Sequence, residues 1–186
     1  ASLTEANQMH MVVYVYMMND IEGLDPRTEY ALQGLQQNLP EFWLFRRTYF
    51  FNWLYFRVMQ AAGPTGGGYF SHLVDSYETE AWDRLTHVLT RLNDNCEYHR
   101  VEFRMVIFPF LHDLGPDYPF KKAHAKLVEF CKSEGIPVLD LEPILEPHIA
   151  EALKVNAYDA HPNERAHKLA ADAIETHLLK DVFLEE

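Results

Sequence analysis

Positive charge is scarce in this sequence of 186 residues. Sixteen lysines and arginines stand against 28 aspartates and glutamates, which gives a formal net charge of −12 at pH 7. Proteins bind nucleic acids and anionic membranes largely through basic side chains that neutralise phosphate groups. The charge balance therefore argues against nucleic acids and anionic membrane surfaces as partners.

Cysteines and long apolar runs are scarce as well. The two cysteines, Cys96 and Cys131, stand in no CxxC or CxxH pattern of the kind that binds zinc or carries out redox chemistry. No stretch of about 18 uncharged apolar residues offers a transmembrane helix. Residues 1–10 lack the basic and apolar regions of a signal peptide. We expect both cysteines to be small core or boundary residues, and we expect no transmembrane segment. The sequence does not distinguish a cytoplasmic from an exported protein.

Apolar and aromatic residues are plentiful, at 48% and 13% of the chain. A chain of this length buries about two-thirds of the surface that its unfolded state exposes. We therefore expect residues 1–186 to form a single compact domain.

Three short runs of β-forming apolar residues predict three strands. They are 11–18 (MVVYVYMM), 103–110 (FRMVIFPF) and 136–141 (IPVLDL). Unbroken apolar runs of this kind are typical of strands that are covered on both faces. The first run ends in the polar pair Asn19 and Asp20, which marks the end of its strand.

Helical patterns separate and follow these strands. We predict helices from 41 to about 62, from 77 to about 97, from 119 to about 134, and from 164 to about 180, and a flexible connection over 63–68. Pro119 suits the first turn of the third helix, and Gly135 suits its C-terminal cap. Buried strands that alternate with amphipathic helices indicate an α/β fold with a parallel sheet. Three strands are few for such a fold, so the sheet looks incomplete at its N-terminal side.

Two polar clusters could carry chemistry. Asn19 and Asp20 follow the first strand, and Asp159 and His161 precede the last helix. Ligands of open parallel sheets bind beyond the carboxyl ends of the strands. A histidine is the usual general base near neutral pH, and a carboxylate beside it can fix its tautomer.

The sequence resembles the SGNH, or GDSL-type, hydrolases, a family of esterases and lipases. VVYVYMMNDI is similar to the third conserved block of that family, and DAHPNERAH is similar to its last block. The resemblance implies a flavodoxin-like three-layer α/β/α fold. It also implies that His161 is the general base, that Asp159 orients it, and that Asn19 donates a hydrogen bond to the oxyanion. Such an enzyme needs no metal or organic cofactor.

The nucleophile of that family is missing. Its serine lies in a Gly-Asp-Ser block ahead of the Asn-Asp block, whereas this sequence contains no GDS, and none of its four serines follows a predicted strand. We therefore expect a C-terminal part of a longer protein, whose absent N-terminal segment carries the serine. The expected substrate is a small-molecule, carbohydrate or lipid ester. The alternatives are an O-acetyltransferase that acts on a polysaccharide, and a noncatalytic binding domain of the same fold.

Simpler interpretations stand beside the catalytic one. Asp159 could cap the last helix, and Asn19 could only form a turn. His161 with Asp159, or His112 with Asp113, could bind a metal, although further ligands at suitable spacing are lacking. We expect Asn163 to order the entry to the last helix, and His167 to be a packed or capping residue. The aromatic helix from 41 could pack on the sheet, or it could form a lid or a contact surface.

Overall fold

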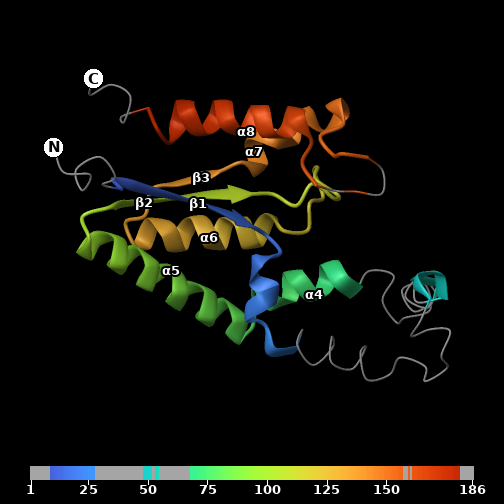
Figure 1. The fold of residues 1–186 in the computed structure, drawn as a ribbon, viewed down its shortest axis with the longest axis horizontal. Helices are drawn as coiled ribbons and strands as arrows, with labels where there is room; N and C mark the ends of the chain where they lie inside the picture. Colours follow the sequence, from blue (N-terminus) through green and yellow to red (C-terminus); the bar gives the residue numbers. More distant parts are fainter. Residues whose placement is uncertain are drawn as a thin grey trace. The chain divides into compact units, whose positions relative to one another are not determined.

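The computed structural model describes residues 9–27, 48–51, 53–54, 68–156, 159 and 161–180. The chain divides into two compact units, one comprising residues 1–20 and 85–186 and the other residues 21–84 (Figure 1). Among the described residues, no helix is both long enough and apolar enough to cross a membrane.

The first unit is built on a small parallel sheet. Its described strands are β1 (Met11–Met17), β2 (Glu102–Phe108) and β3 (Val138–Asp140), in the order β1-β2-β3. Tyr14 lies opposite Met105, and Met105 lies opposite Val138. The three predicted strands and their parallel arrangement are confirmed, with bounds that are one to three residues shorter or shifted. The α/β class is confirmed with them.

The strands differ in burial according to their place in the sheet. Every residue from 103 to 108 of the central strand β2 is buried. In β1, by contrast, Tyr16 is the only fully buried residue, and Val15 is 45% exposed. The prediction that 11–18 is covered on both faces is therefore wrong for the described chain, because β1 lies at an edge of the sheet where less of its surface is covered.

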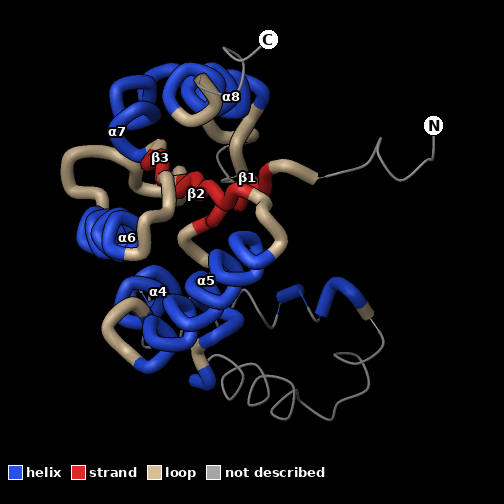
Figure 2. Tube along the Cα trace, turned by 90° about the vertical axis from the view of Figure 1, so that its left-hand side faces the viewer, coloured by secondary structure: helices blue, strands red, loops and turns tan. Residues whose placement is uncertain are grey.

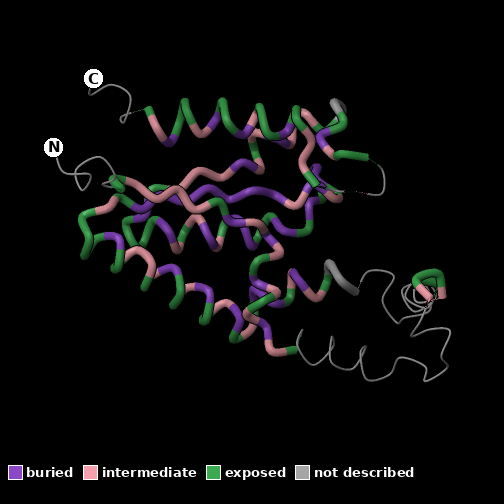
Figure 3. The backbone as a smooth tube through the Cα atoms, in the orientation of Figure 1, coloured by how far each residue is buried: buried purple, intermediate pink, exposed green. Residues whose placement is uncertain are grey.

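Helices lie on both faces of this sheet (Figure 2). One face carries α7 (Glu142–Leu145) and α8 (Glu164–His177), and η2 (Glu146–Glu151) continues the chain after α7. The other face carries α6 (Lys121–Ser133) and the part of α5 (Glu80–Tyr98) that belongs to this unit. Buried residues follow β2 and the inner sides of these helices (Figure 3).

Helix α6 shows how the sequence determines a local element. Ala123, Leu127 and Cys131 recur at four-residue spacing and are buried on one side of the helix. The helix ends before Gly135, whose φ of +70° lies in the left-handed region that glycine adopts without strain. The predicted cap at Gly135 is thus confirmed. Cys131 is buried, as is Cys96, and burial raises the pKa of the Cys131 thiol to about 11.

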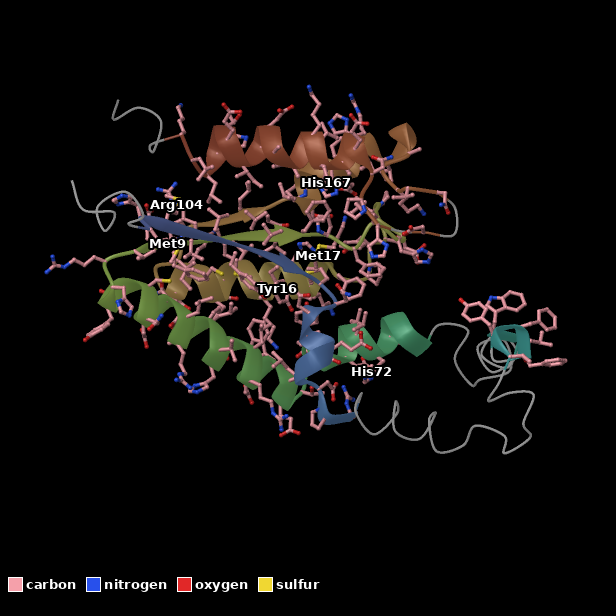
Figure 4. The ribbon with its side chains drawn as sticks, viewed as in Figure 1. Met9, Tyr16, Met17, His72, Arg104 and His167 are labelled. Atoms are coloured by element: carbon pink, nitrogen blue, oxygen red, sulfur yellow. The ribbon has the colours of Figure 1, made fainter. Side chains whose placement is uncertain are left out.

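Arg104 is a charged residue inside the central strand. Its side chain is only 5% exposed, and one guanidinium nitrogen lies 2.7 Å from Glu102 Oε1. Another guanidinium nitrogen donates to the carbonyl of Leu178, directly after α8. Figure 4 shows Arg104 toward the amino-terminal end of the sheet. The guanidinium therefore joins β2 to the end of α8.

The second unit contains η1 from Ile21 onward (Asp20–Leu24), α4 (Gly68–Ser76) and the first turn of α5. Asp25 is buried and accepts hydrogen bonds from Ser76 Oγ at 2.7 Å and from the Arg27 guanidinium at 2.6 Å. The hydrogen bonds from Arg27 are the main cause that holds the pKa of Asp25 far below its usual range. One buried carboxylate thus connects the segment after η1 to the end of α4.

The helices before β2 differ from the prediction. Helix α4 was not predicted, and the helix predicted from 77 begins at Glu80 after a turn. The glycine run 66–68 conceals the start of α4, although the buried residues Leu73 and Tyr77 have helical spacing. The predicted aromatic helix from 41 lies mostly outside the described residues. Within them, residues 49–51, 53 and 54 are helical.

Candidate active site

The carboxyl edge of the sheet brings together the segments that hold the predicted site residues. The three parallel strands end there, at Met17, Phe108 and Asp140. Helix α8 begins over the same edge, just after the segment that contains Asp159 and His161 (Figure 1). Asn19 lies two residues beyond the end of β1. The described geometry therefore places all three predicted residues at one edge of the sheet.

Asp159 and His161 form a direct pair. Asp159 Oδ1 lies 2.6 Å from His161 Nδ1 and also accepts a hydrogen bond from the backbone nitrogen of His161 at 3.0 Å. The backbone hydrogen bond first, and the side-chain hydrogen bond second, lower the pKa of Asp159. An ionised carboxylate can only accept hydrogen bonds, so Nδ1 of His161 carries a proton in this pair. In the neutral imidazole, the lone pair is then on Nε2, the other ring nitrogen. The His161 side chain is 85% exposed, which leaves Nε2 accessible to a reactant.

A short hairpin sets the position of His161. Lys154 and Pro162 form an antiparallel bridge, and the Val155 nitrogen donates to the His161 carbonyl at 3.0 Å. At the turn, the Asn156 side chain accepts from the Asp159 nitrogen at 3.0 Å. The backbone on both sides of the Asp159–His161 pair is therefore hydrogen-bonded.

Asn163 connects this hairpin to α8. Its Oδ1 accepts from the Ala166 nitrogen at 3.0 Å, which makes it the N-cap of the helix. Its Nδ2 donates to the carbonyls of Ala152 and Lys154. The predicted role of Asn163 is confirmed. Asp159 does not cap α8, because Asn163 occupies the cap position.

Asn19 and Asp20 have different roles in the turn after β1. Asp20 Oδ2 accepts from the Met17 nitrogen at 2.9 Å and closes the turn, as expected of a structural residue. The half-buried Asn19 side chain has no hydrogen-bond partner among the described residues. Its amide can therefore donate to a ligand.

The described serines supply no partner for His161. Ser133 is the last residue of α6, which ends next to the amino-terminal side of β3, and its hydroxyl donates to the Phe130 carbonyl. Ser76 is buried in the second unit, where it donates to Asp25. Ser71 is an exposed residue of α4 in that unit, and Ser2 lies outside the described residues. Within the described chain, the ring of His161 is hydrogen-bonded to Asp159 alone.

The metal alternative gains no support from the described residues. His112 Nε2 lies 3.5 Å from Asp113 Oδ2, but nowhere in the described ranges do three histidine, cysteine, aspartate or glutamate side chains come together as metal ligands would. His167, labelled in Figure 4, is exposed on α8, and the centroid of its ring lies 6.4 Å from that of the Phe108 ring.

A second histidine–carboxylate pair was not predicted. His124 of α6 is buried, and its Nδ1 lies 2.7 Å from Oδ1 of Asp140, the last residue of β3. The Tyr118 ring lies edge-on to His124 at 5.7 Å, and the Tyr118 hydroxyl accepts from the Phe110 nitrogen at 2.7 Å. The sequence held two signals for this pair. His124 stands three residues before Leu127 on the apolar side of α6, and β3 ends in Asp140.

One opening among the described residues lies away from this site. A pocket of about 470 Å³ opens at the amino-terminal edge of the sheet, where Glu97, Glu102 and Glu134 contribute to its lining. None of Asn19, Asp159 and His161 lines this pocket.

Comparisons with protein families, curated proteins and solved structures found no match.

Proposed function

We propose that this chain supplies the base, the orienting acid and an oxyanion donor of a serine esterase of the SGNH type. The observation that carries the proposal is the contact of 2.6 Å between Asp159 Oδ1 and His161 Nδ1, at the carboxyl edge of a parallel sheet. The exposed ring of His161 supports it, as does the Asn19 amide at the same edge, which has no hydrogen-bond partner among the described residues. The sequence resemblance to the family adds the assignment of roles.

The reaction follows from the state of the imidazole. Nε2 of His161 takes the proton of a serine hydroxyl as the serine oxygen attacks the ester carbonyl. Asp159 stabilises the imidazolium that forms, and the Asn19 amide donates a hydrogen bond to the oxyanion of the tetrahedral intermediate. The proton then passes from His161 to the departing alcohol. Water then attacks the acyl-enzyme, with His161 again taking the proton, and the carboxylic acid leaves as the serine is restored.

The serine of this proposal lies in a segment outside these 186 residues. In the described chain β1 is an edge strand with Val15 45% exposed, so a further strand can pair along it. A parallel strand paired there ends at the same carboxyl edge as Asn19 and His161. A serine in the turn after that strand would lie beside both residues.

The test compares this chain with a version extended at its N-terminus by the coding sequence that precedes it. The extended protein should hydrolyse an activated short-chain ester, and a fluorophosphonate probe should label one serine in the added segment, as located by mass spectrometry. His161→Ala should abolish both hydrolysis and labelling. His167→Ala, an exposed histidine on α8, is the matched control and should keep them.

Two outcomes would overturn the proposal. Equal activity of the His161→Ala and His167→Ala variants would remove His161 from the reaction. An extended protein that folds but neither hydrolyses the ester nor reacts with the probe would indicate a binding domain instead. Appearance of an acylated sugar when carbohydrate is added would show acyl transfer by the same residues.

A further inference from the structure

Val155 lies across the hairpin from His161. The bridge between Lys154 and Pro162 makes Val155 and His161, the next residues toward the turn, cross-strand neighbours. The Val155 nitrogen donates to the His161 carbonyl at 3.0 Å, which holds the two backbones together. Side chains of residues opposite each other in an antiparallel pair lie on the same face, with Cβ atoms about 4.5–5.5 Å apart. The Val155 side chain is therefore a neighbour of the His161 imidazole.

Both side chains of this pair face solvent. The His161 side chain is 85% exposed, and Val155 is 51% exposed. A single exposed valine is common on protein surfaces, so its exposure alone indicates nothing. Its position beside the imidazole is what matters, because a molecule that reaches the ring can also cover the valine and remove apolar surface from water.

The polar side chains of the hairpin are already engaged. Asn156 accepts from the Asp159 nitrogen, and Asn163 bonds the backbone both within the hairpin and at the start of α8. Lys154 comes directly before Val155 and therefore points to the opposite face. A sugar needs donors and acceptors that match its hydroxyl groups. The face that carries Val155 offers hydrocarbon instead.

The reaction places the alcohol part of the ester at this face. In the proposed mechanism, the bond between the carbonyl carbon and the alcohol oxygen breaks, the oxygen keeps the electron pair, and it takes the proton from Nε2 of His161. The alcohol oxygen must then lie within hydrogen-bond distance of Nε2, about 2.6–3.2 Å. The following atoms of the alcohol come within reach of Val155, whereas the carbonyl oxygen faces Asn19.

We propose that Val155 contacts the alcohol part of the ester and selects an apolar, alkyl-like alcohol over a sugar or another polyol. The inference rests on the proposed esterase function and adds the class of alcohol to it. An alkyl chain at Val155 buries hydrocarbon on both sides of the contact. A polyol in the same place would lose water without gaining hydrogen-bond partners.

Two acetate esters whose alcohol parts have the same chain length test the contact in the N-terminally extended protein. They are heptyl acetate and the acetate of diethylene glycol monomethyl ether. Val155→Thr keeps the branched shape and the backbone donor but replaces a methyl group by a hydroxyl. The ratio of kcat/KM for the heptyl ester to that for the glycol ester should fall about 5- to 10-fold. Val88→Thr, at a valine of α5 that is 49% exposed, is the matched control and should keep the wild-type ratio.

A second pair of esters identifies the part of the substrate that Val155 contacts. Propyl acetate and propyl hexanoate share their alcohol and differ in their acyl group, so the ratio of their kcat/KM values should be the same in Val155→Thr and in the wild type. A change in this ratio without a change in the alcohol ratio would overturn the proposal. A substitution that merely displaced His161 would lower kcat/KM for every ester and leave both ratios unchanged, which would also overturn it.

Failure of this inference can be distinguished from failure of the esterase. An unchanged alcohol ratio in a protein that still needs His161 for hydrolysis removes the Val155 contact alone. An extended protein that hydrolyses neither ester and does not react with the fluorophosphonate probe removes the esterase and the contact with it. Nuclear magnetic resonance of the wild type gives a measurement without any variant. Added 1-heptanol should shift the Val155 methyl signals more than those of Val88, and equal shifts would contradict the contact.

Discussion

Asp159 and His161 are joined through a single oxygen atom, which accepts from both the ring nitrogen and the backbone nitrogen of the histidine. The backbone bond fixes the turn, and the ring bond fixes the imidazole. An acid two residues before a histidine can therefore orient it without any contribution from a distant part of the chain.

Asp159→Asn should separate these two bonds. The amide oxygen can still accept from the His161 nitrogen, but it cannot stabilise an imidazolium. In the N-terminally extended protein we expect kcat/KM for an activated ester to fall by about 10²-fold or more, with little change in Tm. Steady-state kinetics alongside thermal unfolding measure the two effects. A variant as active as the wild type would show that the pair only shapes the turn.

Asn163→Ala should destabilise the protein through the entry to α8. The substitution removes the N-cap and leaves the Ala152 and Lys154 carbonyls without their side-chain donor. We expect a loss of about 1–2 kcal/mol in the free energy of unfolding, measured by urea denaturation. Asn95→Ala, at an exposed position of α5, is the control and should change stability by less than about 0.5 kcal/mol. Equal effects of both substitutions would contradict the assigned role.

Ser76→Ala should weaken the second unit without affecting catalysis. The hydroxyl donates to the buried carboxylate of Asp25, which keeps its hydrogen bonds from Arg27. We expect a cost of about 1–2 kcal/mol in unfolding free energy and unchanged ester hydrolysis in the extended protein. Ser71→Ala, at an exposed position of the same helix, should change neither. Loss of activity with either variant would place the nucleophile on α4.

Acid should destabilise the protein partly through Asp25. Its pKa is lowered in the folded state, so its contribution is present above the ordinary value of 3.8 and is lost as the pH falls toward the lowered value. Asp25→Asn should therefore cost stability near neutral pH, and the difference from the wild type should shrink below about pH 3.8. Unfolding by urea at several pH values measures this, and a difference that is independent of pH would disprove the assignment.

Arg104→Met should destabilise the contact between β2 and α8. The substitution leaves the Leu178 carbonyl without its donor, while the half-exposed Glu102 can return to water. We expect a loss of about 1–3 kcal/mol in unfolding free energy. Arg91→Met, at an exposed position of α5, serves as the control. Similar stabilities of the two variants would show that the guanidinium contributes little.

The sequence predicts the parts of this fold that depend on local patterns. Unbroken apolar runs locate the three strands, and Gly135 marks the end of α6 correctly because only the local backbone is involved. The same reasoning overestimated the burial of β1, since a strand's place in the sheet depends on pairing with residues about 90 positions away. It also missed α4, where three glycines obscure a helical pattern that Leu73 and Tyr77 continue.

The candidate site shows the same division. Asp159 and His161 are two residues apart, so the pattern itself brings them together. His124 and Asp140 are 16 residues apart and meet only because α6 packs beside β3. No pattern within either segment indicates that contact. The nucleophile stays a prediction, because the described residues offer His161 no serine.

Helix α8 is secured at both ends by side chains from other segments. Asn163 ties its first turn to the 152–154 backbone, and Arg104 of β2 holds the carbonyl that follows its last turn. A helix held in this way cannot shift along its axis without breaking one of the two attachments. In the proposed reaction, a displacement of the helix by one residue, about 1.5 Å, would already exceed the tolerance of the hydrogen bond from the serine to Nε2 of His161. Arg104, toward the amino-terminal end of the sheet, thus contributes to the position of His161 at the carboxyl edge.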